Sequence, residues 1–342
     1  MLNRRWLQYG MQRLAATLPI LASVVVFTFV LMRLLPGDPA TYFISSPNAG
    51  PVEIQALRVK LGLDRSLAEQ LVIYVGDLFQ GNMGYSLTTG QPVAKDILAR
   101  LPASMELTAV AFLLVIIVSI PLGVAAATKP NSFLDHVTRI LSTAGVSMPT
   151  FVTGILLIYI FYYRLGWAPD PTGRIDVFTG PPPRVTGFLL VDSLISLDME
   201  RFLAAFKQLI LPATTMALFA IAPVARMTRA TMLGILTSDF IKTAKSLGLP
   251  RRRVLITYAF GNALIPIVTT MGMVLSFMLG ANVLVEKVFS WPGIGSYALD
   301  AVITNDYAPV QGFIFTVAVL FVLLNLTVDL IYGLIDPRIG YE

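Results

Sequence analysis

The chain contains no cysteine and only one histidine among its 342 residues. The absence of cysteine excludes a disulfide framework, thiol catalysis and a metal site built on thiolates. Charged residues make up only 13% of the sequence, about half the ~25% expected of a soluble domain, whereas hydrophobic residues make up 56%. This balance indicates a membrane protein.

Patterns for catalysis and nucleotide binding are also missing. No Gly-Lys dipeptide occurs, so the chain has no phosphate-binding P-loop of the usual form. His136 is followed by no acidic residue at a short spacing, and there is no Gly-x-Ser-x-Gly nucleophile motif. We therefore expect no enzymatic activity, no metal site and no cofactor in this chain. A membrane enzyme, an ion channel and a secondary transporter remain as alternatives, although charged rings and symmetric interrupted helices are not evident.

Six uncharged stretches come close to the ~20 residues that cross a bilayer core as a helix. They are Leu14–Met32, Leu107–Thr128, Ile140–Tyr163, Gln208–Ala225, Ile267–Val285 and Tyr307–Val328. Helices satisfy backbone polar groups within the segment, as lipid requires. We therefore expect an all-α polytopic membrane protein with six transmembrane helices and with both chain ends on one side.

The distribution of Lys and Arg predicts the orientation. If the N-terminus is cytoplasmic, the inner segments hold thirteen basic and five acidic residues, and the outer segments hold twelve basic and fifteen acidic residues. This asymmetry follows the positive-inside rule. The excess of positive charge therefore indicates cytoplasmic N- and C-termini, with residues 1–13 as the cytoplasmic N-terminus, and does not indicate nucleic-acid binding.

Two outer segments separate the spans. The first of them, residues 36–103, follows the first transmembrane helix at 14–35. We expect it to be an extracytoplasmic helical subdomain, because Ser66-Leu67-Ala68-Glu69 fits a capping box. The second outer loop, residues 164–207, is rich in proline and glycine and predicts irregular structure. Glu286 and Lys287 are expected at the outer interface.

A short amphipathic helix is predicted in the inner segment between the fourth and fifth spans. Ser238 or Asp239 can cap its start, and Gly248 followed by Pro250 is a stop signal. One face is predicted to carry Phe240, Ala244 and Leu247, with Ile241 at the border and Lys242 and Lys245 turned away. Such a short helix needs support from a partner protein or from the lipid interface, and amphipathicity alone favours lipid.

The surrounding motifs favour a partner protein. The run from Asp239 to Pro266 resembles the coupling loop of ABC importer permeases, and within them that of the dipeptide and oligopeptide permeases. Other segments are similar to recurring motifs of the same family, in order along nearly the whole chain: Arg33-Leu34-Leu35-Pro36-Gly37-Asp38-Pro39, Ser147-Met148-Pro149, Phe289-Ser290-Trp291-Pro292-Gly293-Ile294-Gly295, Asp306-Tyr307-Ala308-Pro309-Val310-Gln311-Gly312 and Asp336-Pro337-Arg338. The chain departs from the general signature at Thr243-Ala244-Lys245, where that signature begins Glu-Ala-Ala.

The resemblance implies a type I ABC importer (MetI-like) permease fold with an extracytoplasmic helical insertion after the first span. Residues 104–342 would be the permease core, containing the second outer loop and a coupling loop at 226–266. Contacts with the ATPase are expected from residues of the inner helix: Asp239, Phe240, Ala244, Lys245, Leu247 and Gly248. The translocation path is expected to involve polar or soft residues of the fifth span: Met271, Ser276, Met278 and Asn282.

The resemblance also implies partners and a location. The partners are a second homologous permease subunit, two cytosolic ABC ATPase subunits that bind ATP and Mg, an extracytoplasmic solute-binding protein and membrane lipid. The expected location is the bacterial cytoplasmic (inner) membrane. The expected substrates are dipeptides or oligopeptides, because Arg184-Val185-Thr186-Gly187-Phe188 resembles the dipeptide subgroup. Nickel and glutathione remain alternative solutes within the same architecture.

Overall fold

The computed structural model is built from helices. It describes residues 2–34, 51–60, 62–133, 135–140, 148–176 and 178–335. Within these ranges there are α-helices and π-helical segments, but no β-strand beyond an isolated bridge between Tyr85 and Pro92. The all-α class expected from the sequence is confirmed. The motifs Pro36-Gly37-Asp38-Pro39 and Asp336-Pro337-Arg338 lie outside the described residues.

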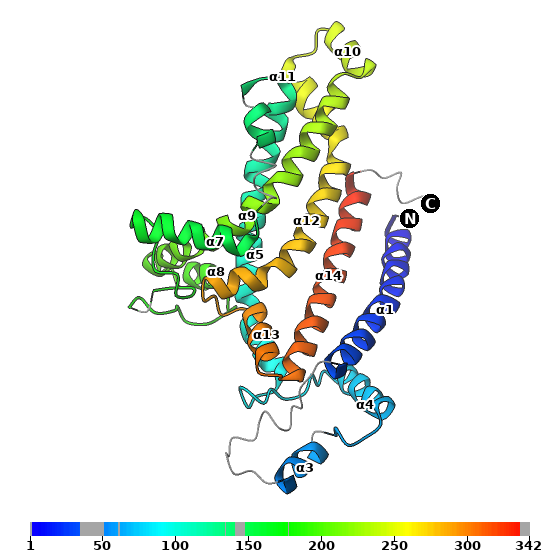
Figure 1. Cartoon of the computed structure of the whole chain (residues 1–342). Coiled ribbons are helices and arrows are strands. Elements are labelled where there is room, and N and C mark those ends of the chain that lie inside the picture. The colour runs from blue at the N-terminus through cyan, green and yellow to red at the C-terminus, as the bar shows by residue number, and fades with distance from the viewer. Residues whose placement is uncertain are drawn as a thin grey trace. The chain divides into compact units, whose positions relative to one another are not determined.

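Figure 1 shows the elements of the chain, with the α-helices labelled. They are α1 (Leu2–Leu34), α3 (Pro51–Lys60), α4 (Leu67–Phe79), α5 (Val93–Thr128), α7 (Thr150–Leu157), η1 (Ile158–Arg164), α8 (Leu189–Ile195), α9 (Met199–Leu236), α10 (Asp239–Ser246), α11 (Arg251–Arg253), η2 (Val254–Phe260), α12 (Gly261–Val288), α13 (Ile294–Ile303) and α14 (Tyr307–Ile335).

Among the described residues, 5 helical segments are long and apolar enough to cross a membrane. They are Thr17–Leu34, Val93–Thr128, Met199–Leu236, Arg251–Val288 and Tyr307–Gly333. These segments contain or overlap five of the six expected spans. Residues 141–147 of the expected third span lie outside the described residues, and its later part forms the shorter apolar segment Thr150–Arg164. The number of six spans therefore stays a prediction.

The contacts divide the chain into two compact units. Unit 1 comprises Met1–Ser104 and Pro292–Val322, and unit 2 comprises Met105–Trp291 and Leu323–Glu342. Helices α5 and α14 each contribute to both units. The sequence-based ranges 1–13, 14–35, 36–103 and 104–342 describe the expected membrane topology, and they stay a prediction.

Unit 1 confirms the local signal at the start of α4. The Ser66 hydroxyl accepts a hydrogen bond from the Glu69 backbone N–H at 3.3 Å, and the Glu69 carboxylate accepts one from the Ser66 N–H at 3.1 Å. A second anchor is Asp306, which directly precedes α14. One carboxylate oxygen of Asp306 accepts hydrogen bonds from the Ser86 hydroxyl at 2.8 Å and the Thr88 N–H at 3.0 Å, so this residue holds the loop before α5 in place.

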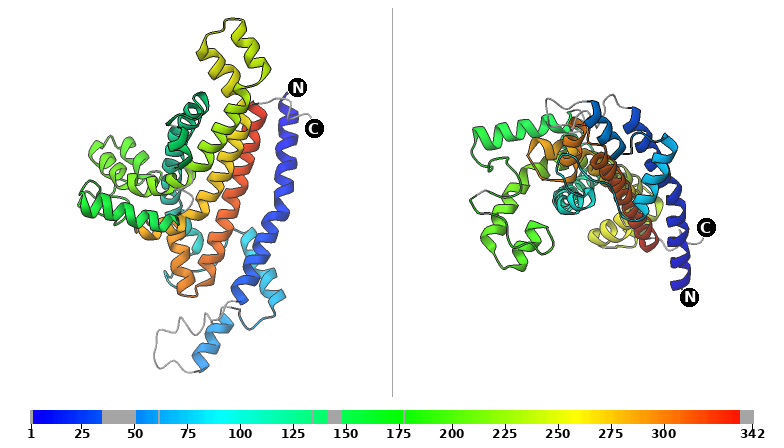
Figure 2. Two further views of the ribbon diagram at one scale, coloured as in Figure 1. Left: turned by 45° about the horizontal axis from the view of Figure 1, so that its top comes forward. Right: turned by 90° about the horizontal axis from the view of Figure 1, so that it is seen from below.

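Unit 2 is organised around α9 and α12, which lie side by side (Figures 1 and 2). Helix α5 meets α9 so closely that a Cβ added to Gly123 would stand 2.6 Å from Thr228 Cβ and 2.7 Å from the Ala225 carbonyl oxygen. Helix α12 meets the last part of α14 at Gly272, where an added Cβ would lie 2.9 Å from Val328 Cγ2. Small residues thus allow helix backbones to approach one another, as is common between membrane helices.

Helix α7 contacts both α9 and α12 and runs at a steep angle to α12 in Figure 1. The crossing occurs at Gly154, which is buried, and an added Cβ there would contact Phe289 and Thr215 at 3.3 Å. Pro149 occupies the N-cap position of α7. A proline there agrees with a helix start, because the missing N–H of proline has no intrahelical partner at the first positions of a helix.

Glu286, near the end of α12, has a side chain that is completely buried in unit 2, whereas the neighbouring Lys287 is exposed. The expected position of both residues at the outer interface stays a prediction. Successive residues of a helix point about 100° apart, so one of two adjacent ionisable residues can face the interior while the other faces outward.

Candidate functional site

The predicted inner helix is present as α10, with the bounds that the sequence indicated. Ser238 is its N-cap residue, but the Ser238 hydroxyl donates to the Ile235 carbonyl at 2.6 Å and does not cap the helix. Asp239 lies in the first turn, where its negative charge interacts favourably with the positive end of the helix dipole. Its carboxylate accepts a hydrogen bond from Lys242 Nζ at 2.8 Å. This ion pair is solvent-exposed and contributes little to stability.

Gly248 ends α10 in the conformation that the sequence predicted. Its φ angle is +75°, in the left-handed region that residues with a Cβ disfavour. The Gly248 N–H donates to the Lys245 carbonyl at 3.0 Å, and the Leu249 N–H donates to the Ala244 carbonyl at 3.3 Å. These two bonds form a Schellman motif, which satisfies carbonyl groups at the end of the helix and turns the chain toward α11.

The apolar face of α10 differs from the prediction. Ile241 is completely buried and Ala244 is 5% exposed, whereas Phe240 is 47% exposed and Leu247 is 75% exposed. At about 100° per residue, Ala244 lies between Ile241 on one side and the pair Phe240 and Leu247 on the other. The predicted set therefore lies on one apolar stripe with Ile241 at its border, but the buried part of the stripe is centred on that border and not on Phe240 and Leu247. The chain buries only the half of the stripe that Ile241 and Ala244 form.

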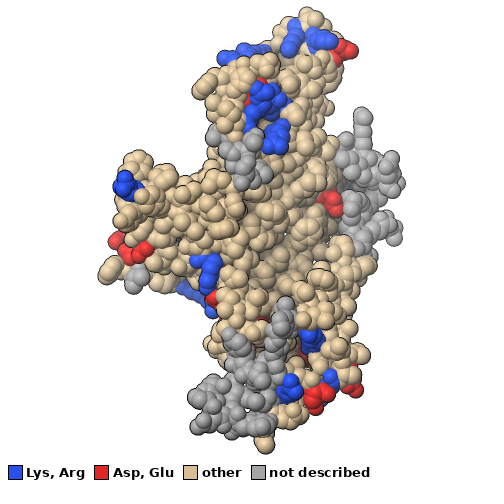
Figure 3. Space-filling model, viewed as in Figure 1, with Lys and Arg blue, Asp and Glu red and all other residues tan. Residues whose placement is uncertain are grey.

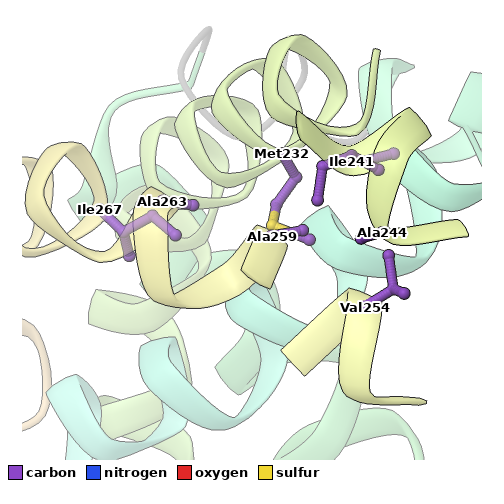
Figure 4. Close-up of a cluster of buried hydrophobic side chains, with 8 residues drawn as sticks. Met232, Ile241, Ala244, Val254, Ala259, Ala263 and Ile267 are labelled. Atoms are coloured by element: carbon purple, nitrogen blue, oxygen red, sulfur yellow. The ribbon is translucent and has the colours of Figure 1, made fainter. Parts of the chain in front are cut away.

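The buried half of the stripe enters a cluster that we call the junction core. Its members come from the ends of α5 and α9, from α10, from η2 and from the start of α12: Ala127, Met232, Ile241, Ala244, Val254, Ala259, Ala263 and Ile267. Figure 4 shows Met232 and Ile241 side by side, with Ala259 facing Met232. The junction core therefore attaches the short helix α10 to three long helices of unit 2.

The exposed side of this region is strongly basic. Lys242, Lys245 and the arginines of α11 (Arg251–Arg253) are exposed, and Figure 3 shows blue Lys and Arg atoms over the end of unit 2 that carries α10 and α11. Lys245 lies in the last turn of α10, where its positive charge interacts favourably with the negative end of the helix dipole. The exposed Phe240 and Leu247 thus stand among solvent-accessible cations.

The residues expected along the translocation path are not brought to one surface. Met278 is 2% exposed and Asn282 is 4% exposed, and the Asn282 side-chain amide donates to Thr108 Oγ1 of α5 at 3.4 Å. Met271 packs against the junction core, and the Ser276 hydroxyl donates to the Gly272 carbonyl at 2.9 Å. These four residues therefore make contacts within unit 2.

The exposed face of α12 carries other residues. Met273 is 69% exposed and Phe277 is 55% exposed, and Gly280 lies on the same face because the three positions are separated by four and three residues. The ring of Phe277 stacks on Phe219 of α9, with ring centroids 4.9 Å apart. The spacing was visible in the sequence, but the sequence alone could not show which face the rest of the chain leaves open.

The second outer loop is organised by an ion pair that sequence reasoning missed. Arg174 Nη2 lies 2.6 Å from a carboxylate oxygen of Glu106, which is 5% exposed on α5. The other Glu106 oxygen accepts a hydrogen bond from the Leu190 N–H at 2.8 Å, and Arg174 also donates to the Gly187 carbonyl at 3.1 Å. A single carboxylate therefore holds both the loop and the start of α8 against α5.

Asp192 of α8 binds a second part of this loop. Its carboxylate accepts hydrogen bonds from the Thr186 N–H and hydroxyl, both at 2.7 Å, and from the Gly187 N–H at 2.9 Å. Burial raises the pKa of Asp192, but these hydrogen bonds to the charged form outweigh burial, and the pKa is lowered overall. The stretch 164–207, which composition predicted to be irregular, thus contains α8 and the start of α9, and two buried carboxylates fix its loop.

No group of three or more His, Asp or Glu side chains suited to a metal ion occurs in the part of the chain that the structure describes. The half-covered apolar stripe of α10 is therefore a candidate interaction surface that does not depend on a metal ion.

Comparison with known proteins gives matches along almost the whole chain. The family described as "Binding-protein-dependent transport system inner membrane component" matches residues 119–341, and the N-terminal family of the same components matches residues 6–108. The chain is 42% identical over 337 residues to a di/tripeptide transport system permease of Pseudomonas aeruginosa, covering 98% of this chain and 99% of that protein.

Two further relatives are similar over the same extent. The chain is 41% identical over 329 residues to a probable D,D-dipeptide transport system permease of Escherichia coli, covering 96% of each protein. It is 38% identical over 335 residues to a dipeptide transport system permease of Alkalihalophilus pseudofirmus, covering 98% of this chain and 100% of that protein. All three relatives carry names of peptide transport permeases.

Proposed function

Because this chain belongs to the family of binding-protein-dependent transport system inner membrane components, we propose that it is a transmembrane subunit of an ATP-driven importer of dipeptides or short oligopeptides. The peptide specificity is supported by relatives at 38–42% identity that are named as di/tripeptide, D,D-dipeptide and dipeptide permeases. The chain would serve as a membrane permease subunit and would catalyse no reaction itself. ATP and Mg would be bound by partner subunits.

The proposed partners follow from the same family. A solute-binding protein would deliver the peptide on the outer side, a second homologous permease subunit would complete the translocation path, and two cytosolic ATPase subunits would bind on the inner side. The proposed location is a bacterial cytoplasmic membrane, with both termini in the cytoplasm. Reporter domains fused after Arg253 and after Gly180 should then give cytoplasmic and external signals, respectively.

The observation that carries the proposal is the half-covered apolar stripe of α10. Ile241 and Ala244 fix the helix to the junction core, and Phe240 and Leu247 remain exposed on the adjacent half of the stripe. A partner that covers these two side chains would be attached to α5, α9 and α12 through the junction core. We propose that Asp239, Phe240, Ala244, Lys245, Leu247 and Gly248 couple the ATPase to the membrane helices in this way.

The test is capture of the ATPase in mild detergent. The double variant Phe240→Ala/Leu247→Ala should remain inserted in the membrane but lose most of the ATPase that the wild-type chain retains. Phe133→Ala is the matched control, because Phe133 is 85% exposed in unit 2 but lies outside α10. Wild-type capture by the double variant would remove the docking assignment.

The substrate is tested separately, with the assembled complex in vesicles. Import of a labelled dipeptide that unlabelled dipeptides block, and that nickel and glutathione leave unchanged, would support the peptide assignment. Import of nickel or glutathione in place of the dipeptide would refute the peptide assignment but would still agree with an ATP-driven importer. Uptake without ATP or without partner subunits would instead indicate a channel or a secondary transporter.

The translocation path is proposed to run along α12. Met271 and Ser276 are partly exposed, whereas Met278 and Asn282 contact other parts of unit 2. Asn282 would therefore reach the path only in a state in which α12 moves away from Thr108 of α5, and Met278 only in a state that uncovers its side chain. The exposed Met273 and Phe277 are available without such a movement and are added to the proposed set.

A further inference from the structure

A buried ion pair joins the segment after α5 to α9. Asp135 is completely buried, and its two carboxylate oxygens accept hydrogen bonds from Nε and Nη2 of Arg229, the second at 2.7 Å. The Asn131 N–H also donates to Asp135 at 3.0 Å. The pairing is therefore bidentate, a geometry that the planar guanidinium of arginine provides and the ammonium of lysine does not.

The pair stands beside a close approach of α5 and α9. Gly123 of α5 lies against Ala225 and Thr228 of α9 so closely that no Cβ fits without movement. Arg229 follows Thr228 directly, and Asp135 reaches it from the segment that follows α5. The glycine contact and the ion pair together fix how far one helix can slide past the other.

Both helices pass from this crossing directly into the junction core. Ala127 lies one turn after Gly123 on α5, and Met232 lies one turn after Arg229 on α9; the two residues are 2% and 0% exposed. The same cluster contains Ile241 and Ala244 of α10. The ion pair is thus one helical turn away from the side chain of α9 that supports α10.

We propose that Asp135 and Arg229 are positioning residues that keep α5 and α9 in a fixed register, so that a force applied to α10 moves both helices together. This inference rests on the proposed function, because it assigns the pair a role in transmitting motion from the ATPase. Without the pair, the junction core would still hold α10 to α9, but α5 could slide relative to α9. ATP hydrolysis would then continue with less transport.

The test uses the complete importer in lipid nanodiscs for ATP hydrolysis and in vesicles for peptide import. Arg229→Gln removes the pair, and Arg201→Gln is the matched control, because Arg201 pairs with Asp198 at 2.9 Å near the start of the same helix. Arg229→Gln should raise the ATP hydrolysed per peptide imported several fold, and Arg201→Gln should leave this ratio unchanged. Arg229→Lys should give an intermediate ratio, and the exchange Asp135→Arg/Arg229→Asp should lower the ratio again.

Hydrogen exchange provides a readout that does not depend on transport. Amides of residues 239–248 should exchange faster in Arg229→Gln than in Arg201→Gln, because α5 no longer supports α10 in a fixed register with α9. If Arg229→Gln does not insert, Arg229→Lys, which retains the charge, takes its place in both measurements. An unchanged ratio with unchanged exchange overturns the proposal. Import and hydrolysis that fall in proportion also overturn it, since that result indicates a stability role alone.

The two proposals fail in different ways. If the wild-type complex imports no peptide with ATP, the proposed function is refuted. If the wild-type complex is coupled and the Arg229 variants retain the wild-type ratio, only the positioning role of Asp135 and Arg229 is refuted.

Discussion

Phe240 and Ile241 are adjacent in the chain, yet Ile241 is completely buried in the junction core whereas Phe240 is 47% exposed. The two side chains of α10 therefore face different surroundings. Ile241 attaches the helix to its own chain, and Phe240 remains available to a partner.

Substitutions at these two positions should differ strongly in their effect on stability. Ile241→Ala removes a fully buried side chain and should destabilise unit 2 by about 2–5 kcal/mol. Phe240→Ala removes an exposed side chain and should change stability by about 0.5 kcal/mol or less. Thermal unfolding in detergent measures both effects. A large loss of stability in Phe240→Ala with none in Ile241→Ala would contradict the assignment of the two faces.

Gly248 should be sensitive to substitution for a conformational reason alone. No atom lies within 4 Å of an added Cβ, so Gly248→Ala introduces no clash, but the φ angle of +75° costs about 1–2 kcal/mol for a residue with a side chain. Gly261→Ala is the control, because Gly261 is helical and its added Cβ also meets open space. Hydrogen exchange at Leu249, which donates to Ala244, should become faster only in Gly248→Ala.

Gly123 should be sensitive for a steric reason. An alanine Cβ would stand 2.6 Å from Thr228 Cβ and 2.7 Å from a backbone oxygen, so α5 and α9 must separate, at a cost of about 1–3 kcal/mol. Gly280→Ala adds the same methyl group in the middle of a helix, where no atom lies within 4 Å. Melting temperatures of the two variants should therefore differ, and equal values would contradict the close approach at Gly123.

Acid should weaken the contact between Asp135 and Arg229 only at low pH. The hydrogen bond from Arg229 lowers the pKa of Asp135 to about 2, against an ordinary value of 3.8. Because the folded pKa is the lower one, the pair contributes its full stabilisation above the ordinary pKa and loses it as the pH falls toward 2. The difference in melting temperature between the wild-type chain and Asp135→Asn should be constant at neutral and weakly acidic pH, and should shrink below about pH 4.

The same experiment has an internal check. If the difference in melting temperature already disappears near neutral pH, the carboxylate of Asp135 does not have the lowered pKa that its contacts with Arg229 and Asn131 produce.

Glu106 should hold the second outer loop in place. Glu106→Gln leaves Arg174 in a largely buried position without its counter-charge, and removing one partner of such a pair costs about 3–5 kcal/mol. The exposed Arg184 in this loop provides a trypsin site, and cleavage there should become faster in Glu106→Gln. Glu200→Gln, at an exposed position in the first turn of α9, should leave the cleavage rate unchanged.

Local signals in the sequence predicted several elements well. Ser66 and Glu69 specify the start of α4 within four residues, and Gly248 with Pro250 specifies the end of α10, because capping depends on neighbours in the chain. Long uncharged runs predicted six spans, and five of them coincide with long apolar helices for a similar reason, since the length of an apolar run is a property of a single segment.

Features that depend on distant residues were not predictable in this way. Ile241 is buried because Met232 and Val254 surround it, and no pattern within α10 distinguishes Ile241 from Phe240. Glu106 and Arg174 are 68 residues apart, and Asp135 and Arg229 are 94 residues apart. A single sequence does not show which of many isolated charges become partners.

The junction core also has a consequence for biosynthesis. Its members extend along the chain from Ala127 to Ile267, so the junction core is complete only when the first turns of α12 have been made. Chains that stop earlier would lack the part of the core that α12 contributes, and the support of α10 would be incomplete. A firmly held α10 therefore indicates a chain whose later helices are in place. If partner subunits bind only to a firmly held α10, unfinished chains would not enter the complex.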